Sequence, residues 1–569
     1  MKTIASKINQ SRLWLAILLL ALTLPSRLIN IDRAINIDEP FWIISSSNFY
    51  YSVTHRDFEN TYFEYHPGVT NMWIISTALH SYFPEYRGYG KGFFDTRKPK
   101  FEEFMRSHDK EVIDLVRISR FIQAGILAVL AVTAFLLLSM LVGDSAAFFS
   151  IALATIAPFF LGHSRLLNME SMAALFVLTS FLGMQVYLNR ERKLFYLLLS
   201  GATFGLAQLT KSTSIALLGV VGLMMFVGLF KRDETSFGAR FKDAVKTFAI
   251  WFGTAALVYF IVWPGMWVAP GKMLSGVYGN AFSYAFQGAR LDVTEELEPA
   301  SFSLVTRFEG IYQYLRYWAS STTFLTWFGL AFASFFLLSK NKDRVIKSIL
   351  GYLVVLGALF MLMFGIAQGR NAAHYIMSSY VAFDVIAGIG WGYALLWAQN
   401  RWRWLSHTYA AFAALIVLTV AQIGFGLPYA PYYFTYKNPF ASEAATYGYG
   451  EGYAEAADYL AQKPNAEKIQ AYVYNGMGTF SFFFPGKTLV FKRVYLIEED
   501  YTSIADEIRK SDYLVLYPIV KNKQPETEKV LTALQGATPE KTIFINGLEY
   551  ILIYKTTDIP ESVYEQIVR

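Results

Sequence analysis

Two adjacent carboxylates, Asp38 and Glu39, follow the first apolar segment of the chain and precede Pro40. A carboxylate at a partly dry place beside a membrane suits a general base, because desolvation brings its pKa toward the working pH. Acidic residues before a proline are also typical of a helix start. These residues alone leave both interpretations open.

Cationic side chains and histidines recur near the ends of later apolar segments. An arginine fork donates two parallel hydrogen bonds to a phosphate, and a histidine beside a Pro-Gly turn can donate one more. Each has a structural alternative: a surface histidine, an ion pair with a nearby carboxylate, a lysine that reaches the headgroups or an interfacial anchor. The candidates for anion binding are His66, Arg165, Lys211 and Arg370, and Glu170 follows Arg165 at a helix start.

A carboxylate base and a set of cations beside a bilayer are what sugar transfer from a lipid-linked phosphosugar requires. The base activates an acceptor hydroxyl, and the cations stabilise the charge that builds on the departing phosphate. No nucleotide diphosphate leaves in such a reaction, and the outer loops contain no Asp-x-Asp pair. We therefore expect no cofactor and no metal ligands, although a divalent cation is compatible with the reaction. The chain has no cysteine, which excludes disulfides, thiolate metal sites and cysteine nucleophiles.

The elements that must position these residues are membrane-spanning helices. The chain is 54% hydrophobic and 17% charged, whereas soluble domains carry about 25% charged residues. Its apolar residues fall in segments close to the roughly 20 residues that span a bilayer. About eleven transmembrane helices are predicted, at residues 12–30, 118–142, 146–162, 170–188, 195–210, 212–230, 247–268, 321–338, 348–367, 374–397 and 407–427.

Lysine and arginine are concentrated in alternate connections between these segments. The richest connections are residues 190–193, 231–246, 340–347 and 401–403. Because basic residues favour the cytoplasmic side, this predicts a multi-pass protein of the cell membrane with a cytoplasmic N-terminus. The outer loops are then 31–117 and 269–320. We divide the chain into a membrane domain, residues 1–430, and an extracytoplasmic domain, residues 431–569.

The C-terminal region alternates between helix-like and strand-like stretches. The helix-like stretches are residues 454–462 and 501–510, and the β-rich runs are residues 469–474, 513–517, 542–545 and 550–554. This alternation predicts a small α/β domain. The region contains no glycine-rich phosphate loop.

Several short motifs occur together in the chain: Asp38-Glu39, His66-Pro67-Gly68, Ser164-Arg165 with Glu170, Leu209-Thr210-Lys211, Trp263-Pro264-Gly265-Met266-Trp267, and the segments 432–439 and 448–452. In this combination the chain resembles the protein O-mannosyltransferases of glycosyltransferase family 39 and their bacterial relatives, including the aminoarabinose transferases that modify lipid A. Two positions depart from the family pattern. Bacterial relatives have Lys-Pro-Pro where this chain has His66-Pro67-Gly68, and aspartate is usual at the position of Glu170.

The resemblance implies a mainly α, polytopic membrane protein with the glycosyltransferase C fold that uses polyprenyl-phosphate sugars. It implies that Asp38 is the catalytic base. We further expect Glu39 to assist the orientation of Asp38 and Glu170 to position the acceptor or a cation. For donor-phosphate binding we assign the cationic and histidine side chains described above, His66, Arg165, Lys211 and Arg370.

The expected function is inverting transfer of a sugar from a polyprenyl-phosphate carrier to an acceptor hydroxyl on the outer face of the membrane. The expected partners are the lipid-linked donor, a protein, lipid or glycan acceptor, and membrane lipids, without nucleic acid. A transporter or flippase of lipid-linked sugars is the alternative, and it predicts inverted repeats and broken mid-membrane helices. A non-catalytic scaffold is a third interpretation, in which Asp38→Asn leaves glycan products unchanged.

Overall fold

The structure is a computed structural model of the 569-residue chain. Two compact units make up the fold. The first comprises Met1–Ile29, Ser52–Ile74 and Phe121–Ala441, and the second comprises Asn30–Tyr51, Ile75–Arg120 and Ser442–Arg569. The predicted domain boundary at residue 430 stays a prediction. The structure describes residues 2–88, 92–96, 100–230, 236–288, 291, 304–339, 343–367, 372–405, 408–440, 448–474, 476–490, 501–518 and 525–569.

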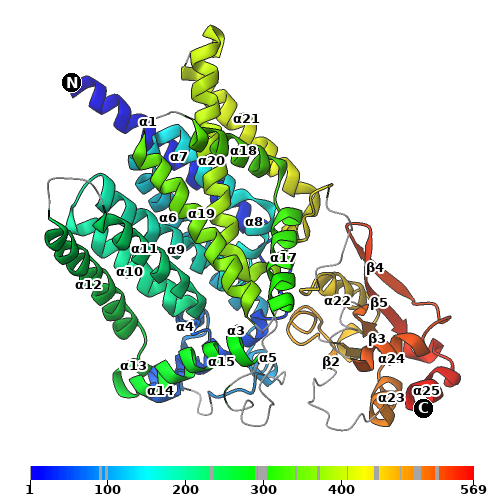
Figure 1. Cartoon of the computed structure of the whole chain (residues 1–569). Coiled ribbons are helices and arrows are strands. Elements are labelled where there is room, and N and C mark those ends of the chain that lie inside the picture. The colour runs from blue at the N-terminus through cyan, green and yellow to red at the C-terminus, as the bar shows by residue number, and fades with distance from the viewer. Residues whose placement is uncertain are drawn as a thin grey trace. The chain divides into compact units, whose positions relative to one another are not determined.

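Helices dominate the chain as far as residue 426 (Figure 1). In chain order they are α1 (Lys2–Thr23), α2 (Pro25–Leu28), α3 (Glu39–Thr54), α4 (Val69–Tyr82), α5 (Lys100–Arg106), α6 (Val112–Val142), α7 (Asp144–Ile156), α8 (Pro158–Ser164), α9 (Glu170–Asn189), α10 (Leu194–Thr210), α11 (Ala216–Leu229), α12 (Phe237–Val262), α13 (Gly265–Val268), α14 (Pro270–Leu274), α15 (Asn280–Gln287), α17 (Leu304–Ser321), α18 (Phe324–Leu338), α19 (Arg344–Ile366), α20 (Met377–Arg401) and α21 (Thr408–Gly426).

Seven helices within the described residues are long and apolar enough to cross a membrane, or up to nine if each of two bent pairs is one span. The predicted count of eleven is therefore not confirmed. One predicted span, 146–162, is broken into α7 and α8, which meet at an angle of 63°. The break falls at Pro158, which has no N–H to continue the hydrogen bonding of α7. The predicted span 195–210 is α10, whose 17 residues are fewer than the roughly 20 of a full crossing.

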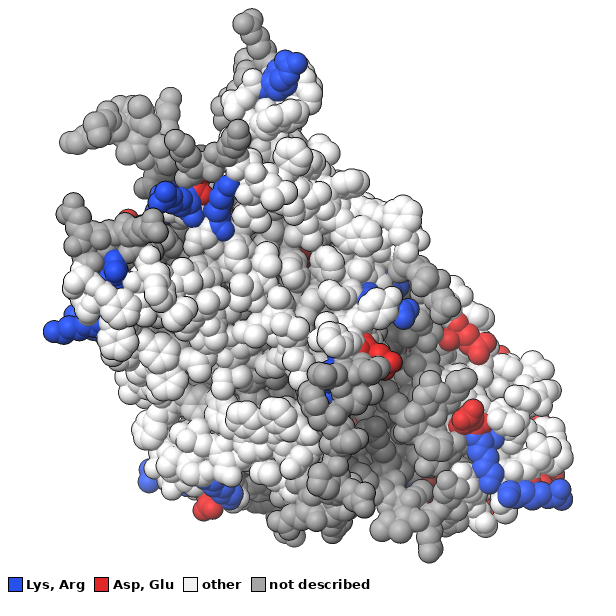
Figure 2. Space-filling model, in the orientation of Figure 1, with Lys and Arg blue, Asp and Glu red and all other residues white. Residues whose placement is uncertain are grey.

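A broad face of the helical unit carries hardly any charged atoms, and Lys and Arg side chains lie above and below it (Figure 2). Many large apolar side chains on α12 and α18 are exposed, and Phe335 is 81% exposed. A soluble protein rarely leaves an apolar surface of this extent in water. This surface confirms a multi-pass membrane protein.

Small residues allow α20 to pack closely against its neighbours in the first unit. A Cβ added at Gly388 would lie 2.2 Å from Ser150 in α7, and one at Gly390 would lie 2.0 Å from the carbonyl of Gly329 in α18. Such close approach is typical of helix packing in membranes, where dispersion contacts replace the hydrophobic effect. The α20 helix is therefore fixed against two neighbours by its own glycines.

The second unit contains a five-stranded sheet. Its strands are β1 (Gln470–Val473), β2 (Lys487–Val490), β3 (Tyr513–Leu516), β4 (Lys541–Ile545) and β5 (Leu548–Lys555), in the order β2-β1-β3-β5-β4. The β1 strand pairs parallel with β2 and β3, while β5 pairs antiparallel with β3 and β4. The strands predicted at 469–474, 513–517, 542–545 and 550–554 are confirmed. The β2 strand is not predicted, because its four residues are partly exposed and carry no alternating pattern.

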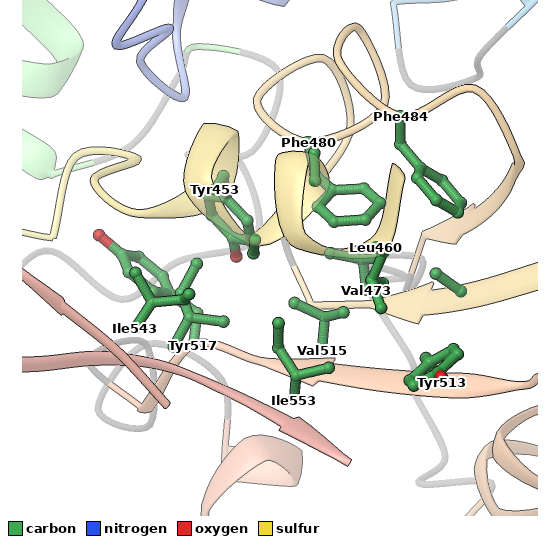
Figure 3. Close-up of a cluster of buried hydrophobic side chains, with 14 of the residues drawn as sticks. Tyr453, Leu460, Val473, Phe480, Phe484, Tyr513, Val515, Tyr517, Ile543 and Ile553 are labelled. Atoms are coloured by element: carbon green, nitrogen blue, oxygen red, sulfur yellow. The ribbon is translucent and has the colours of Figure 1, made fainter. Parts of the chain in front are cut away.

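Helices cover the sheet on both faces. Successive residues of a strand point to opposite faces, and apolar residues on both faces are buried under helices. Tyr453 and Leu460 of α22 (Tyr453–Ala461) pack on Val473, Val515 and Ile553 of the strands (Figure 3). A second buried cluster lies on the other face and includes residues of α23 (Tyr501–Lys510), α24 (Pro525–Ala533) and α25 (Glu561–Val568). The α/β character predicted for this region is therefore confirmed.

One buried carboxyl links α5 to the C-terminal part of the second unit. The Ser481 hydroxyl donates a 2.9 Å hydrogen bond to Glu102, and Arg106 of the same helix donates to the carbonyls of Ser481 and Phe484. Burial raises the pKa of Glu102 to about 7 against an ordinary value of 4.5, although Ser481 and Arg106 oppose the shift. The folded unit therefore binds a proton here more tightly than the unfolded chain.

This predicts that the second unit loses stability as the pH rises from 4.5 to about 7. The loss is on the order of 3 kcal/mol, because each unit of pKa difference is worth about 1.4 kcal/mol. Glu102→Gln keeps an acceptor for Ser481 and should remove this dependence, so its unfolding temperature should exceed that of the wild type at pH 8 and match it at pH 4.5. Glu103→Gln, at an exposed neighbouring position, is the matched control. A wild-type profile that stays flat across this range would contradict the prediction.

Candidate active site

The turn that carries Asp38 is a reciprocal helix cap at the start of α3. The Asn36 side chain accepts hydrogen bonds from the backbone N–H groups of Asp38 (2.7 Å) and Glu39 (3.0 Å). In return, the Glu39 carboxylate accepts from the Asn36 N–H at 2.8 Å. This is a capping box, with a carboxylate three residues after the capping side chain. The helix-start interpretation of these residues is thus correct, and it fixes the backbone of Asp38.

Glu39 is completely buried and paired with Arg120 of α6. The Arg120 guanidinium donates to both Glu39 oxygens at 2.6 and 2.7 Å. It also donates to the backbone carbonyls of Ile31, Arg33 and Ala34. Every charge and most donors of this buried pair are satisfied, as burial requires. Glu39 therefore holds the turn before α3 in place, and its predicted assistance to Asp38 stays a prediction.

The Asp38 side chain is half-buried and bound by a tyrosine from the far end of the sequence. The Tyr449 hydroxyl donates a 2.8 Å hydrogen bond to Asp38 Oδ2. The Tyr449 side chain is itself buried. A carboxylate in this setting is accessible to a substrate yet held by a directional bond, which suits a base.

In the first unit, Glu170 and Lys211 form a buried ion pair. The Lys211 ammonium donates to Glu170 Oε1 at 2.7 Å and lies 4.7 Å from the ring centroid of Tyr375. The side chains of Lys211 and Glu170 are only 3% and 8% exposed. Glu170 is the first residue of α9, where the positive end of the helix dipole adds to the stability of its charge.

Lys211 lies at a break between two helices. It has an extended backbone (φ −148°, ψ 122°) after α10 and before the short helix Ser212–Ile215. The loop that carries His66 lies against this break: His66 Nδ1 and Ser212 Oγ are hydrogen-bonded at 3.1 Å, and the Gly68 N–H donates to the carbonyl of Thr210. The structure therefore brings together two residues that the sequence predicts to bind phosphate.

Arg165 has contacts that the sequence does not predict. Its guanidinium donates to the carbonyl of Ser26 at 2.6 Å and to that of Ile29, and it lies over the ring of Tyr433. Ser26 and Ile29 lie at the end of α2, whose last carbonyls need donors. Arg165 therefore caps α2, and its predicted role in phosphate binding stays a prediction. Arg370 lies outside the described residues.

A cavity of about 300 Å³ opens beside His66 and Ser212. Its walls are mainly aromatic and aliphatic, as in sites that hold an apolar ligand with a few polar groups. Lys211 lies next to it, because Ser212 and Tyr375 contribute both to the cavity wall and to the surroundings of the lysine. The lining residues are Tyr65, His66, Ser212, Thr213, Ile215, Tyr278, Ala281, Phe282, Tyr284, Ala285, Phe286, Met363, Phe364, Ile366, Ala367 and Tyr375.

The predicted site residues therefore fall into two sets. Asp38 and Glu39 lie in the second unit, whereas His66, Arg165, Glu170 and Lys211 lie in the first. Their catalytic and phosphate-binding roles stay predictions. Within the described part of the chain, no group of three or more His, Asp or Glu side chains could hold a metal ion, and the expectation of no cofactor also stays a prediction.

Four residues that contact these two sets are not found from sequence alone: Arg120, Tyr449, Ser212 and Tyr375. Arg120 does leave a signal, because an arginine inside an apolar helix needs a buried partner. Tyr449 belongs to the glycine-rich motif 448–452, but the motif does not indicate its partner. Ser212 and Tyr375 leave no signal, since hydroxyl and aromatic side chains are common at helix ends in membranes.

Residues 114–271 match the family model of dolichyl-phosphate-mannose-protein mannosyltransferases. No curated protein matches the chain in sequence. Among solved structures, ArnT from Cupriavidus metallidurans bound to undecaprenyl phosphate has a TM-score of 0.50 at 13% identity, covering 94% of this chain and 97% of that chain. The oligosaccharyltransferase AglB from Archaeoglobus fulgidus, in complex with an inhibitory peptide and a dolichol-phosphate, has a TM-score of 0.48 at 11% identity, covering 91% and 71%. The Pmt1-Pmt2 protein O-mannosyltransferase complex of S. cerevisiae bound to the sugar donor has a TM-score of 0.34 at 18% identity, covering 44% and 33%.

The likeness to ArnT extends over nearly the whole of both chains and confirms the predicted glycosyltransferase C fold. The family match covers most of α6 and all of α7 to α13. It therefore includes Arg165, Glu170 and Lys211. The transporter alternative gains no support from these comparisons. The match and the fold together identify the chain as a membrane glycosyltransferase that is similar, over residues 114–271, to the dolichyl-phosphate-mannose-protein mannosyltransferases.

Proposed function

We propose that the chain transfers a sugar, with inversion at the anomeric carbon, from a polyprenyl-phosphate carrier to an acceptor hydroxyl. The observation that supports it most is the Glu170–Lys211 pair beside the apolar cavity. A lipid phosphate has an apolar chain and an anionic head. The cavity suits the chain, and the lysine, His66 and Ser212 suit the head. ArnT, of the same fold, is bound to a carrier of this class.

The Glu170–Lys211 ion pair is suited to a lipid-linked sugar donor that binds and dissociates in each catalytic cycle. Without a donor, Glu170 neutralises Lys211, and this avoids an uncompensated buried charge. An ammonium has three N–H donors, and within the described residues Lys211 uses one of them in a hydrogen bond, to Glu170. The other two can bind phosphate oxygens while the pair stays intact. Lys211 thus holds the leaving group without losing its partner.

The proposed reaction is a single displacement. Asp38 takes the proton of the acceptor hydroxyl, the hydroxyl oxygen bonds to the anomeric carbon, and the bond from that carbon to the phosphate oxygen breaks. Lys211 and His66 stabilise the charge on the departing polyprenyl phosphate. Attack from the face opposite the phosphate inverts the anomeric configuration. The bias of Lys and Arg toward alternate connections supports a reaction on the outer face, with a cytoplasmic N-terminus.

Incubation of the purified protein with a panel of polyprenyl-phosphate hexoses and pentoses tests the proposal. Peptides, lipids and sugars with free hydroxyls serve as acceptors. We expect acceptor-dependent release of polyprenyl phosphate with at least one donor, and a product of inverted configuration. Lys211→Met should lower the rate by roughly 10²–10³-fold, as does the loss of one preorganised donor to a developing anion.

Lys272→Met is the matched control, since Lys272 is half-exposed and pairs with Glu59 at the surface. The double variant Lys211→Met/Glu170→Gln removes the unpaired buried charge and should fold but stay inactive. Absence of release with every donor, or full activity in Lys211→Met, would refute the proposal.

A further inference from the structure

The C-terminal part of the second unit provides the hydrogen bond that holds Asp38. Tyr449 lies 411 positions after Asp38 in the chain, and its hydroxyl donates to Asp38 Oδ2 at 2.8 Å. The carboxylate group of an aspartate rotates about its Cβ–Cγ bond. A hydrogen bond to one carboxylate oxygen therefore fixes the direction in which the other oxygen points. The position of this tyrosine therefore determines where the carboxylate points.

Tyr449 is held by a buried carboxyl two residues further on. Glu451 is completely buried, and its Oε2 accepts from the Tyr449 N–H at 2.7 Å and from the Tyr517 hydroxyl at 2.6 Å. The Tyr517 hydroxyl also accepts from the Gly450 N–H at 3.3 Å. Burial raises the pKa of Glu451, while these hydrogen bonds oppose the shift. Burying a carboxyl costs free energy unless hydrogen-bond donors surround it. The donors to Glu451 therefore favour a single arrangement of the backbone around Tyr449.

Glycines let this segment approach the Asp38 turn. Gly448, Gly450 and Gly452 have φ values of 77°, 109° and 88°, a region that disfavours residues with a Cβ. A Cβ at Gly450 would lie 2.7 Å from the carbonyl oxygen of Ile35. The alternating glycines thus allow the backbone around Tyr449 to lie directly against the residues just before Asp38.

Resting on the proposed function, we propose that Tyr449 is a positioning residue for the Asp38 base and that Glu451 anchors Tyr449. The C-terminal part of the second unit therefore contributes to the catalytic apparatus. A base displaced by about 1 Å can lose 10²-fold in rate. The effect should appear in the chemical step, because neither Tyr449 nor Glu451 belongs to the proposed phosphate site.

The test is steady-state kinetics of Tyr449→Phe in the full-length protein, with donor and acceptor concentrations varied separately. Phenylalanine keeps the buried ring and removes the hydroxyl alone. We expect kcat to fall roughly 10–100-fold, with the KM for the lipid-linked donor unchanged. Glu451→Gln should lower kcat in the same way, since it weakens the hold on the Tyr449 backbone. Tyr459→Phe, which removes a hydroxyl that bonds to Glu540 at the surface, should keep wild-type kinetics.

Asp38→Asn, measured in parallel, separates this inference from the proposed function. If Asp38→Asn is inactive while Tyr449→Phe keeps the wild-type kcat, the positioning role is wrong and the base assignment stands. If Tyr449→Phe raises a KM and leaves kcat unchanged, Tyr449 binds substrate and the inference is again overturned. If Asp38→Asn is fully active, the proposed mechanism itself fails. Thermal unfolding of each variant shows that a loss of kcat does not come from misfolding.

Discussion

Asp38→Asn is expected to lower the transfer rate by roughly 10²–10⁴-fold, the usual contribution of a general base. Asparagine has nearly the same shape but cannot take the acceptor proton. It can still accept the Tyr449 hydrogen bond, and the helix cap uses only the backbone N–H of residue 38. The fold and the donor KM should therefore stay close to wild type. Measurement of kcat and donor KM with the active lipid-linked sugar tests this.

Asp32→Asn is the control for a general effect of lost negative charge nearby. Asp32 pairs with Arg117, whose side chain is 48% exposed, and this exposed pair should contribute little. We expect its kinetics to match the wild type. A transfer rate for Asp38→Asn within about threefold of wild type, far short of the effect of losing a base, would mean that another group takes the proton.

Arg120→Met is expected to destabilise the protein by about 3–5 kcal/mol, as is typical when one partner of a buried ion pair is removed. The change leaves Glu39 charged and buried, and it also deprives the carbonyls of Ile31, Arg33 and Ala34 of their donor. Transfer activity should fall as well, because these groups hold the turn that carries Asp38. Thermal unfolding in detergent and kcat at a permissive temperature measure the two effects.

Arg117→Met, one turn earlier on α6, is the matched control. Arg117 also bonds to two carboxylates, those of Asp32 and Asp114, but at the surface. Its loss should cost about 0–1 kcal/mol. The double variant Arg120→Met/Glu39→Gln should recover part of the stability, since no unpaired charge is left behind. Equal stability of Arg120→Met and Arg117→Met would show that the Glu39–Arg120 pair does not hold the turn.

The sequence by itself determines the class of the protein. Apolar segments near 20 residues predict a multi-pass membrane protein, because hydropathy depends on composition and not on partners. Local patterns also predict the β-rich runs of the C-terminal region, since alternation with a period of two is a property of each strand alone. The family resemblance predicts the type of enzyme and places Glu170 and Lys211 in it. The number of spans is less certain from sequence, because α7 and α8 form one apolar run that bends at Pro158.

Only the tertiary structure decides which groups meet. Glu39 reaches Arg120 across 81 positions, Glu170 reaches Lys211 across 41, and Asp38 reaches Tyr449 across 411. Nothing in the local sequence distinguishes Asp38 from Glu39. In the structure, Asp38 is half-buried and hydrogen-bonded to Tyr449, whereas Glu39 is fully buried in an ion pair with Arg120. The physical reason is that the free energy of a buried charge depends on the partners that packing brings to it. Those partners come from helices and connecting segments that the chain order does not place together.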